Sequence, residues 1–399
     1  RSRSGATRML AAVHGSMEVA PASPRWSVVI PVHDCAAYLR RLLPEVLAQL
    51  PLDSQITVVD DRSSDDPETV VHEVGRGRVE YVRNERRLGA VANFNRCLSL
   101  ARGELVHLLH GDDAVAPGFY PAMESALSDG ACVAAVCRTT YVDDDDRILK
   151  VTRSERTGDG PWSEVLQALA VSNRVASPSI VVRRAAYDRA GGFREELRHA
   201  ADWEMWTRLA STGPVWYVDR PLAVYRVRAT SDTSTLVRTG DNIRDRVRAI
   251  GAIGELLGRR RRLRAGQAFA YSAVFAARTA ARCWRAGDAV TAWVQLRAAA
   301  WCLLLTVTAG RWRAPSPLAP SRGDDAVAEA VGDAELGGVE RDERDRLWQP
   351  LGGGEVDRIG EPQGLLPGER RRPVEAALVD RHDVESIPDE PDGILEIRA

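Results

Sequence analysis

The chain has 399 residues, of which 44% are hydrophobic, which suits a catalytic domain of ordinary size with additional segments. Its 54 basic and 56 acidic residues give a net charge of −2, so the overall charge gives no reason to expect a nucleic-acid partner. The six cysteines include no Cys-x-x-Cys pair, which argues against the common zinc and redox motifs and indicates buried thiols in a reducing cytoplasm.

The two ends of the chain differ from its middle in composition. Residues 1–24 lack the apolar stretch of a secretory signal and are rich in Ser, Ala and Pro, so we expect them to be disordered. Since the sequence opens on Arg1, we expect either a fragment or a natural start at Met9 or Met17. Residues 314–399 are rich in Gly, Pro, Asp, Glu and Arg with little apolar periodicity, which predicts a second disordered region.

Strand and helix patterns alternate from Trp26 onward. The run WSVVIPV is apolar and rich in β-branched residues, as in a strand buried on both faces, and residues 36–50 carry leucines at helical spacing. Further strands are predicted from QITVVD, VEYV, ELVHLL and CVAAVC, with helices between them. Short helices between successive strands predict right-handed crossovers and a doubly wound, mostly parallel sheet with flanking helices. Such sheets bind ligands beyond the carboxyl ends of their strands.

Polar residues follow three of these predicted strands. The first strand leads into PVHD (31–34), the second ends in DDRSS (60–64), and ELVHLL leads into HGDD (110–113). Adjacent carboxylates are costly to place together unless a cation neutralises them, and Mg²⁺ and Mn²⁺ prefer oxygen ligands from carboxylates and phosphates. Asp112 and Asp113 therefore suggest a metal that holds a diphosphate. A solvated loop explains this pair equally well on its own, and the acidic cluster at 60–61 favours the metal.

The order of these motifs resembles glycosyltransferase family 2, whose members have the GT-A fold. The matching stretches are VVIPVHDCAAYLRRLL, ITVVDDRSS, NERRLGAVANFNRCLSLARGELVHLLHGDD, GGF and ADWEMWTRLASTG. They follow one another within residues 25–230, and the resemblance implies a GT-A catalytic domain over that range. The Arg-rich amphipathic pattern that follows predicts a helical segment at residues 231–313.

The resemblance implies which residues hold the nucleotide-sugar. Pro31 and His33 would lie along the base, and Asp61, with Asp60 beside it, would contact the base or the ribose. Three further residues would sit near the nucleotide or frame its pocket: Arg87, Gly89 and Asn93.

It also implies a metal and a catalytic base. Asp112 would bind the Mn²⁺ or Mg²⁺ ion that bridges the donor diphosphate, with Asp113 as a second ligand. Asp202 would be the general base that deprotonates the acceptor hydroxyl, giving single displacement with inversion. From the residues alone, Asp202 is better explained as a helix N-cap or first-turn carboxylate, and Trp203 as core.

Three residues depart from the family's pattern. His110 replaces the first acid of the Asp-x-Asp motif, and Ala201 stands where an acid often precedes the base. Arg228 occupies a position where many relatives carry a histidine that helps to hold the metal or diphosphate, and an arginine there can pair with phosphate directly. These changes bear on metal affinity more than on the fold.

One apolar stretch, AAAWCLLLTVTAG, invites comparison with a membrane span. It is shorter than the roughly 20 residues that a span needs, so a buried helix is favoured. Peripheral contact through residues 259–313 stays open, because RRRRLR at 259–264 can meet anionic lipid.

Other classes of protein fit less of the chain. A phospho-receiver domain shares the VVDD strand end, but it needs a lysine at a later strand end, and Lys150 lies in a predicted loop. A dinucleotide-dependent oxidoreductase lacks its Gly-x-Gly-x-x-Gly turn after the first strand. The three departures leave open an inactive relative that binds a nucleotide-sugar or glycan without transfer.

We therefore expect an inverting, metal-dependent glycosyltransferase. It would move a sugar from a nucleoside diphosphate to a hydroxyl of a glycan or lipid-linked acceptor, with no nucleic-acid partner. The resemblance implies cell-envelope polysaccharide synthesis as its setting, in the cytoplasm and peripheral at the inner face of the membrane.

Overall fold

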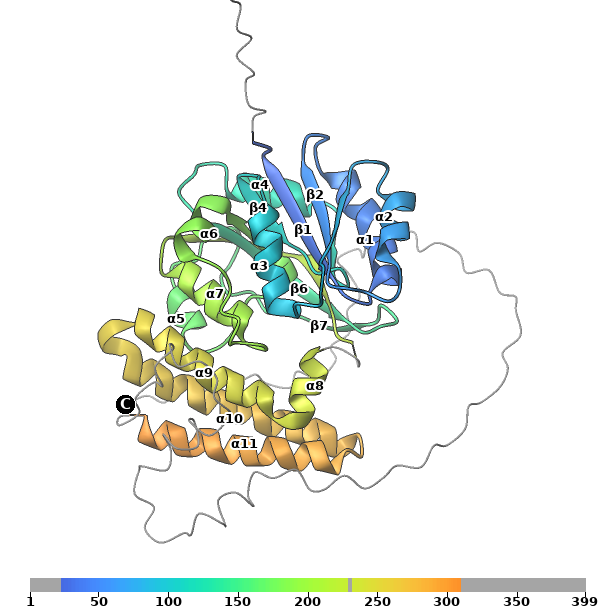
Figure 1. Cartoon of the computed structure of the whole chain (residues 1–399). Coiled ribbons are helices and arrows are strands. Elements are labelled where there is room, and N and C mark those ends of the chain that lie inside the picture. The colour runs from blue at the N-terminus through green and yellow to red at the C-terminus, as the bar shows by residue number, and fades with distance from the viewer. Residues whose placement is uncertain (1–22, 229–231, 310–399) are drawn as a thin grey trace, which may run out of the picture. The chain divides into compact units, whose positions relative to one another are not determined.

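The computed structural model describes residues 23–228 and 232–309. The disorder predicted for residues 1–22 and 314–399 lies outside these ranges. Within them, a ten-stranded sheet has helices on both faces (Figure 1). Its strands are β1 Trp26–Val32, β2 Gln55–Asp60, β3 Glu80–Arg83, β4 Leu105–Leu108, β5 Ala114–Val115, β6 Ala134–Val142, β7 Ile148–Val151, β8 Gly160–Pro161, β9 Ile180–Arg183 and β10 Val215–Arg226.

The helices fall before and after the last strand. Those before it are α1 Ala36–Gln49, α2 Pro67–Val74, α3 Ala90–Leu100, α4 Phe119–Ala126, α5 Val165–Leu169, α6 Arg184–Ala190 and α7 Ala201–Ala210. Those after it are α8 Asp232–Thr239, α9 Asp241–Leu256, α10 Arg261–Arg285 and α11 Ala289–Thr308. The boundary predicted near residue 230 thus falls between β10 and α8, and the division of the chain into domains stays a prediction.

The sheet confirms the predicted fold class. Its strand order is β3-β2-β1-β4-β9-β6-β10-β5, and β3, β2, β1 and β4 are parallel. Strand β9 is antiparallel to both β4 and β6, and β6 is parallel to β10. Consequently β1, β2, β4, β6 and β10 all point the same way, and their carboxyl ends share one edge of the sheet.

Two apolar cores hold the helices on the sheet. Strand β1 is buried along its whole length, as its unbroken apolar run predicts. On one face α1, α2 and α4 pack through residues such as Leu39, Val70 and Phe119. On the other, α3, α6, α7 and α9 pack through residues such as Cys97 and Trp206. All six cysteines are free, and five of them are buried.

One prediction about the region after β5 is wrong in detail. The runs PVWYVD and LAVYRV form the single strand β10, because irregularities in its register with β6 around Pro221 carry the chain past the proline. Lys150 lies in β7 rather than a loop, with its ammonium 4.3 Å from the centre of the Tyr141 ring.

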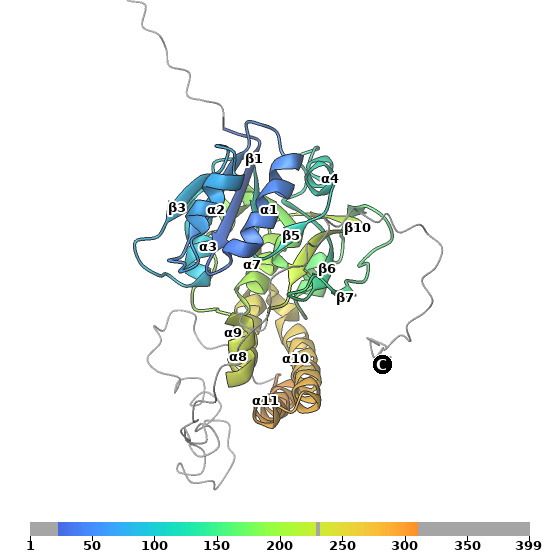
Figure 2. The same ribbon diagram turned by 90° about the vertical axis from the view of Figure 1, so that its right-hand side faces the viewer.

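The helices after residue 231 pack on one another and on α7. Helices α10 and α11 run side by side, and α9 contacts both α10 and α7 (Figures 1 and 2). Among the described residues, α11 is the one helix long and apolar enough to cross a membrane, with a mean hydropathy of 1.5 and 39% of its apolar window buried. One such helix is weak evidence for a span.

Candidate active site

The loop His110–Asp113 lies at the carboxyl edge of the sheet, directly after β4. Gly111 packs so closely that a Cβ on it would lie 2.6 Å from Val32 Cγ1 and 2.8 Å from Cys35 Sγ. Its amide also donates to the carbonyl of Pro31 at 3.1 Å. Glycine is thus required here, and it holds the loop against the end of β1.

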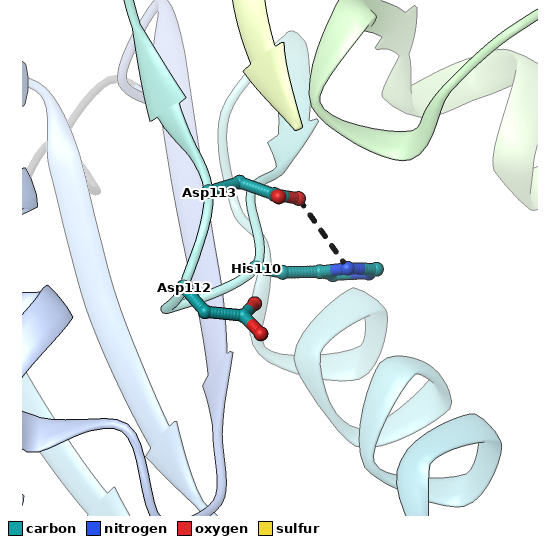
Figure 3. Close-up of side chains that lie close together, drawn as sticks. All are labelled: His110, Asp112 and Asp113. Atoms are coloured by element: carbon teal, nitrogen blue, oxygen red, sulfur yellow. Dashed lines mark ion pairs between the residues drawn. The ribbon is translucent and has the colours of Figure 1, made fainter. Parts of the chain in front are cut away.

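His110, Asp112 and Asp113 form a group that can hold a metal ion. One ligand atom from each residue lies within 4.8 Å of the other two, and the three side chains gather on one side of the loop (Figure 3). An imidazole with two carboxylates is a reasonable donor set for a divalent transition ion. The sequence assigned His110 no ligand role, since it departs from the family's acidic motif.

His110 Nδ1 lies 3.6 Å from Asp113 Oδ2, and two buried polar atoms of this group lack hydrogen-bond partners among the described residues. Asp113 is buried, and its Oδ1 accepts from the Arg226 amide at 3.0 Å, while its Oδ2 has no hydrogen-bond partner. His110 Nε2 is buried and equally without one. Burial, with the nearby charge of Asp112, raises the pKa of Asp113 well above its ordinary value, and burial lowers the pKa of His110. A bound cation would offset both penalties, so the residues fit a metal.

Two arginines at the end of β10 and just beyond it tie this loop to the rest of the edge. Arg228 Nη1 donates to Asp112 Oδ2 at 3.2 Å, and its Nη2 donates to the carbonyl of Asp34 at 3.2 Å. Arg226 is buried and donates to the carbonyls of Asp112 and Asp143 at 3.1 and 2.6 Å. Arg228 therefore neutralises part of the charge of Asp112.

Asp60 is satisfied inside the protein. It is fully buried and accepts from the Ser63 amide at 2.8 Å, from Tyr81 Oη at 2.8 Å and from Arg83 Nη1 at 2.9 Å. These contacts fix the turn that follows β2 and join it to β3. In this structure the Asp60 carboxylate thus stabilises the loop that follows β2.

Asp61 organises the next loop in the same way. Its Oδ1 accepts from Asn84 Nδ2 at 2.9 Å and from the Leu88 amide at 2.7 Å, and its Oδ2 accepts from the Gly89 amide at 2.8 Å. Asn84 also donates to Asn93 Oδ1 at 2.9 Å. Asp61, Gly89 and Asn93 are thus brought together, and a direct contact with base or ribose stays a prediction.

The remaining predicted nucleotide residues lie around this loop and β1. Pro31 is buried in β1, and His33 is half-buried with its Nε2 3.6 Å from Asp34 Oδ2. Arg87 is exposed on the loop before α3. Gly89 has φ +89°, a conformation that favours glycine at the start of α3.

Asp202 lies in the first turn of α7. The side chain is only half-buried by exposed area, yet its carboxylate is deeply desolvated, and this burial raises its pKa to about 6. Its Oδ2 accepts from Asn173 Nδ2 at 2.9 Å and its Oδ1 from the Trp203 amide at 2.6 Å. Trp203 itself is core, 1% exposed, with its Nε1 donating to the carbonyl of Leu169.

Aromatic side chains connect Asp202 with the metal group. Burial, with smaller contributions from the charges of Asp202 and Asp113, raises the pKa of Tyr141 on β6 and of Tyr225 on β10, whose ring centres are 5.1 Å apart. Phe94 stacks on His110 at 4.8 Å. The two carboxylates thus lie within electrostatic range of the same two tyrosines.

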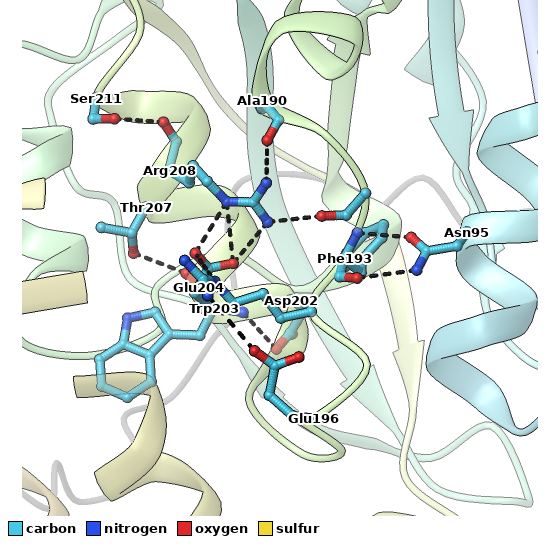
Figure 4. A network of polar contacts seen from close by, with 12 residues as sticks. Asn95, Ala190, Phe193, Glu196, Asp202, Trp203, Glu204, Thr207, Arg208 and Ser211 are labelled. Carbon is cyan, nitrogen blue, oxygen red and sulfur yellow. Dashed lines mark hydrogen bonds and ion pairs between the residues drawn. The ribbon is translucent and has the colours of Figure 1, made fainter. Parts of the chain in front are cut away.

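The GGF turn is held by a buried ion-pair network (Figure 4). Glu204 is fully buried and accepts from Arg208 Nη2 at 2.8 Å and from Arg194 Nε at 3.1 Å. Arg208 also donates to the carbonyls of Ala190 and Gly192. From α3, Asn95 exchanges two hydrogen bonds with the backbone of Phe193. Gly191 has a positive φ, +81°. The motif thus fixes α7 relative to α3.

Sequence reasoning missed several residues of the site. Asn173, Arg226, Asn84 and Tyr141 each lie far in sequence from the carboxylates they contact or face, and no local motif marks them. For His110 a signal was present, because an imidazole three residues before Asp113 at a strand end can ligate the same ion.

Comparisons with known proteins show which family the chain belongs to. Residues 27–191 match glycosyl transferase family 2. An uncharacterized protein of Mycobacterium tuberculosis is 35% identical over 247 residues, 59% of this chain and 77% of its own length. The GalNAc(5)-diNAcBac-PP-undecaprenol beta-1,3-glucosyltransferase of Campylobacter jejuni is 30% identical over 110 residues, 27% of this chain and 36% of its own.

Among solved structures, TarS 1–349 of S. aureus in complex with UDP-GlcNAc is 17% identical. It aligns with a TM-score of 0.46 and covers 69% of this chain and 92% of its own. The family match spans the strand ends that carry Asp61 and the HGDD loop, and the mycobacterial relative extends the similarity over most of its own length. The chain belongs to glycosyl transferase family 2 and is a glycosyltransferase.

Proposed function

We propose that the protein transfers a sugar from a nucleoside diphosphate sugar to a hydroxyl of a glycan or lipid-linked acceptor, with inversion at the anomeric carbon. The observation that carries this proposal is the shared position of two kinds of group at the carboxyl edge. One is the metal-binding set His110, Asp112 and Asp113. The other is the desolvated carboxylate of Asp202, with a pKa of about 6.

The donor would bind across the ends of β1, β2 and β4. Asp112, Asp113 and His110 would hold a divalent ion, Mn²⁺ or Mg²⁺, which when bound neutralises the charge of the leaving diphosphate. Arg228, already beside Asp112, would pair with a phosphate oxygen. The loop that Asp61 fixes, which includes Arg87 and Gly89, would frame the nucleoside, with Pro31 and His33 along the base.

Asp202 would act as the general base. A carboxylate with a pKa of about 6 is mostly ionised at neutral pH and is a stronger base than an exposed aspartate. The acceptor oxygen forms its bond to the anomeric carbon, its proton passes to Asp202, and the bond to the diphosphate breaks. Asn173 and the Trp203 amide hold the two carboxylate oxygens in place for this transfer.

The acceptor class rests on the similarity to the Campylobacter jejuni enzyme, whose name specifies a polyprenyl-diphosphate-linked glycan. A lipid-linked acceptor would place the reaction at the cytoplasmic face of the cell membrane, in envelope polysaccharide synthesis. The free, buried cysteines fit a reducing compartment.

An apolar stripe on α11 supports peripheral contact with such a membrane. Six exposed residues of α11 are apolar and recur at helical spacing: Trp293, Leu296, Ala300, Leu303, Leu304 and Val307. Residues 261–309 contain seven arginines and a single acidic residue, Asp288. This charge opposes pairing with a second copy of the same surface and favours an anionic bilayer.

Vesicle sedimentation tests the membrane contact. The full chain should sediment with vesicles that contain phosphatidylglycerol and much less with pure phosphatidylcholine. Replacing Trp293 and Leu303 with serine should reduce binding, whereas Leu52→Ser removes an equally exposed apolar side chain of the catalytic region and should not. Equal sedimentation of all three proteins would contradict the assignment, and a dimer that the serine variant loses would identify a second copy as the occupant.

Calorimetric binding of UDP, GDP and dTDP, each with and without Mn²⁺, tests the donor site. Metal-dependent binding of one nucleotide, lost in Asp112→Ala, is the expected result. Turnover with a matched donor and acceptor would exclude a non-catalytic relative, the alternative suggested by His110, Ala201 and Arg228. If no nucleotide binds under any condition, the proposed donor site is wrong.

A further inference from the structure

Helix α7 carries Asp202 but does not cap its own N-terminus. Its N-cap residue is Ala200, which has no side-chain hydrogen bond to offer. The missing acceptor comes from α9: Asp245 Oδ2 accepts from the amides of His199 and Ala200 at 2.6 and 2.8 Å. A carboxylate at this position satisfies two backbone donors and interacts favourably with the helix dipole. The start of the helix that carries Asp202 is thus fixed by a residue of the helical segment.

The next residue of α9, Arg246, is a buried arginine that also contacts the first turns of α7. Arg246 is 6% exposed, and its guanidinium carbon lies 4.8 Å from the Trp203 ring centre and 5.0 Å from that of Phe275. Its Nε donates to Ser272 Oγ at 3.2 Å, while its Nη2 is buried without a hydrogen-bond partner in the described part of the chain. There it also forms no ion pair with a carboxylate within 4.0 Å.

A buried cation without an ion-pair partner acts on the nearest charges through a medium of low polarity. Burial lowers the pKa of Arg246, and Asp202 is among the groups that raise it again. In turn Arg246 lowers the pKa of Asp202, against the larger effect of burial. Hydrogen bonds from the Trp203 amide and Asn173 lower the pKa of Asp202 more than Arg246 does, and the amide of Asp202 itself lowers it less.

A second cation, Arg174, follows Asn173 and lies 5.9 Å from the Tyr271 ring centre, but it pairs with Glu155 at 3.5 Å. The other titratable groups near Asp202 are neutral at pH 7. Tyr141 and Tyr225 face it from β6 and β10, and burial raises the pKa of both. His199, just before α7, has its pKa lowered to about 4 by burial and by Arg246, so it is neutral at pH 7. Tyr271 on α10 interacts with Arg246 itself.

We propose that Asp245 and Arg246 are positioning residues for Asp202: Asp245 fixes the start of α7, and Arg246, buried against Trp203, places a positive charge without an ion-pair partner beside the turn that carries Asp202. This inference rests on the proposed role of Asp202 as general base. On this proposal, proton transfer to Asp202 depends on α9, a helix that follows the last strand of the sheet.

The pH dependence of kcat tests the role of Arg246. Arg246→Met keeps an unbranched stem against Trp203 and removes the charge, so the acidic limb of the profile should move up by about 1 pH unit. Arg246→Lys retains the charge and should leave the limb near its wild-type position. Arg244→Gln is the matched control, because Arg244 lies on the same helix and pairs with Asp241 at 2.9 Å.

Asp245→Ala tests the cap separately. It should lower kcat at every pH without moving the limb and with little change in the KM for the donor, whereas Asp245→Asn, which keeps an acceptor oxygen, should restore part of the rate. A loss of rate in Arg246→Met with an unmoved limb would reduce Arg246 to a packing residue and overturn its assignment. If Arg246→Met does not fold, a limb in Arg246→Lys displaced as far as 1 pH unit would do the same, since the charge is kept.

The role of Asp202 as base and the role of Arg246 would be rejected by different results. Turnover that survives in Asp202→Asn would remove the proposed base and this inference with it. Turnover that disappears in Asp202→Asn, with an unshifted profile in Arg246→Met, would leave the proposed function intact and reject only the role of Arg246.

Discussion

Replacing Asp113 with asparagine separates the metal-binding role of the HGDD loop from its role in folding. Asparagine has nearly the same size and keeps an oxygen that can accept from the Arg226 amide, the one hydrogen bond that the structure gives the carboxylate. It removes the buried charge on the atom that has no hydrogen-bond partner, Oδ2. Without metal, Asp113→Asn should therefore be at least as stable as the wild type, because a neutral amide is less costly to bury than a carboxylate.

The sign of the pH effect follows from the raised pKa of Asp113. The folded state binds the proton more tightly than the unfolded chain does, so ionisation of this group lowers stability as the pH rises above the ordinary carboxyl range. The metal-free wild type should lose stability over that range relative to Asp113→Asn. With metal the order reverses, because the ion binds the folded wild type and offsets the cost.

The size of the reversal can be given in thermal terms. An ion present at 100 times its Kd stabilises the folded state by about 2.7 kcal/mol, which is a rise in Tm of about 3–5 °C for a chain of this size. Thermal melts with and without Mn²⁺ measure it. Asp188→Asn, an exposed aspartate on α6, is the control and should respond to Mn²⁺ like the wild type. If Mn²⁺ raises the Tm of Asp113→Asn as much as that of the wild type, His110, Asp112 and Asp113 do not form the metal site.

Three further predictions concern the base and the packing around the site. In the wild type kcat should fall about tenfold per pH unit below pH 6, since protonated Asp202 cannot accept the acceptor's proton, and Asp202→Asn should lower kcat by about 10²–10⁴-fold with nucleotide binding unchanged by calorimetry. Glu204→Gln should cost about 3–5 kcal/mol in denaturant unfolding because it leaves Arg208 and Arg194 without their buried partner, whereas Glu196→Gln, at an exposed pair, should cost about 1 kcal/mol or less. Gly111→Ala should cost about 1–3 kcal/mol and weaken Mn²⁺ binding, because its Cβ would displace Val32 or Cys35; unchanged metal affinity would show that the loop tolerates the shift.

The sheet and the place of its acidic clusters could be predicted from the sequence for a simple reason. A strand buried on both faces is visible as an unbroken apolar run, and the first polar residue after it must lie at the sheet's edge. Asp60 and the HGDD loop follow such runs, and both lie where expected. The alternation with helices sets the strands parallel, which brings those ends to the same edge.

The partners of the carboxylates could not be predicted, because they depend on register and on contacts between distant segments. Asp60 meets Tyr81 and Arg83 only because β2 and β3 pair with Asp60 opposite Arg83. The cap that α7 lacks comes from Asp245, 45 residues after Ala200. In the sequence, Ala200 is only an alanine at a helix start and Asp245 only an aspartate inside another helix. Neither residue indicates that the two are in contact.

The departures at His110 and Arg228 are better explained together than singly. The family resemblance implies an acid at position 110 and, in many relatives, a histidine at 228. Here the imidazole follows β4 and a cation follows β10, so this edge still offers a nitrogen, two carboxylates and a positively charged group. Arg228 pairs with Asp112 and adds a positive charge, which a neutral histidine at position 228 would not add. With one carboxylate fewer and one cation more, the site should hold its ion more weakly when empty of donor and gain more from the diphosphate, so that metal and nucleotide bind together.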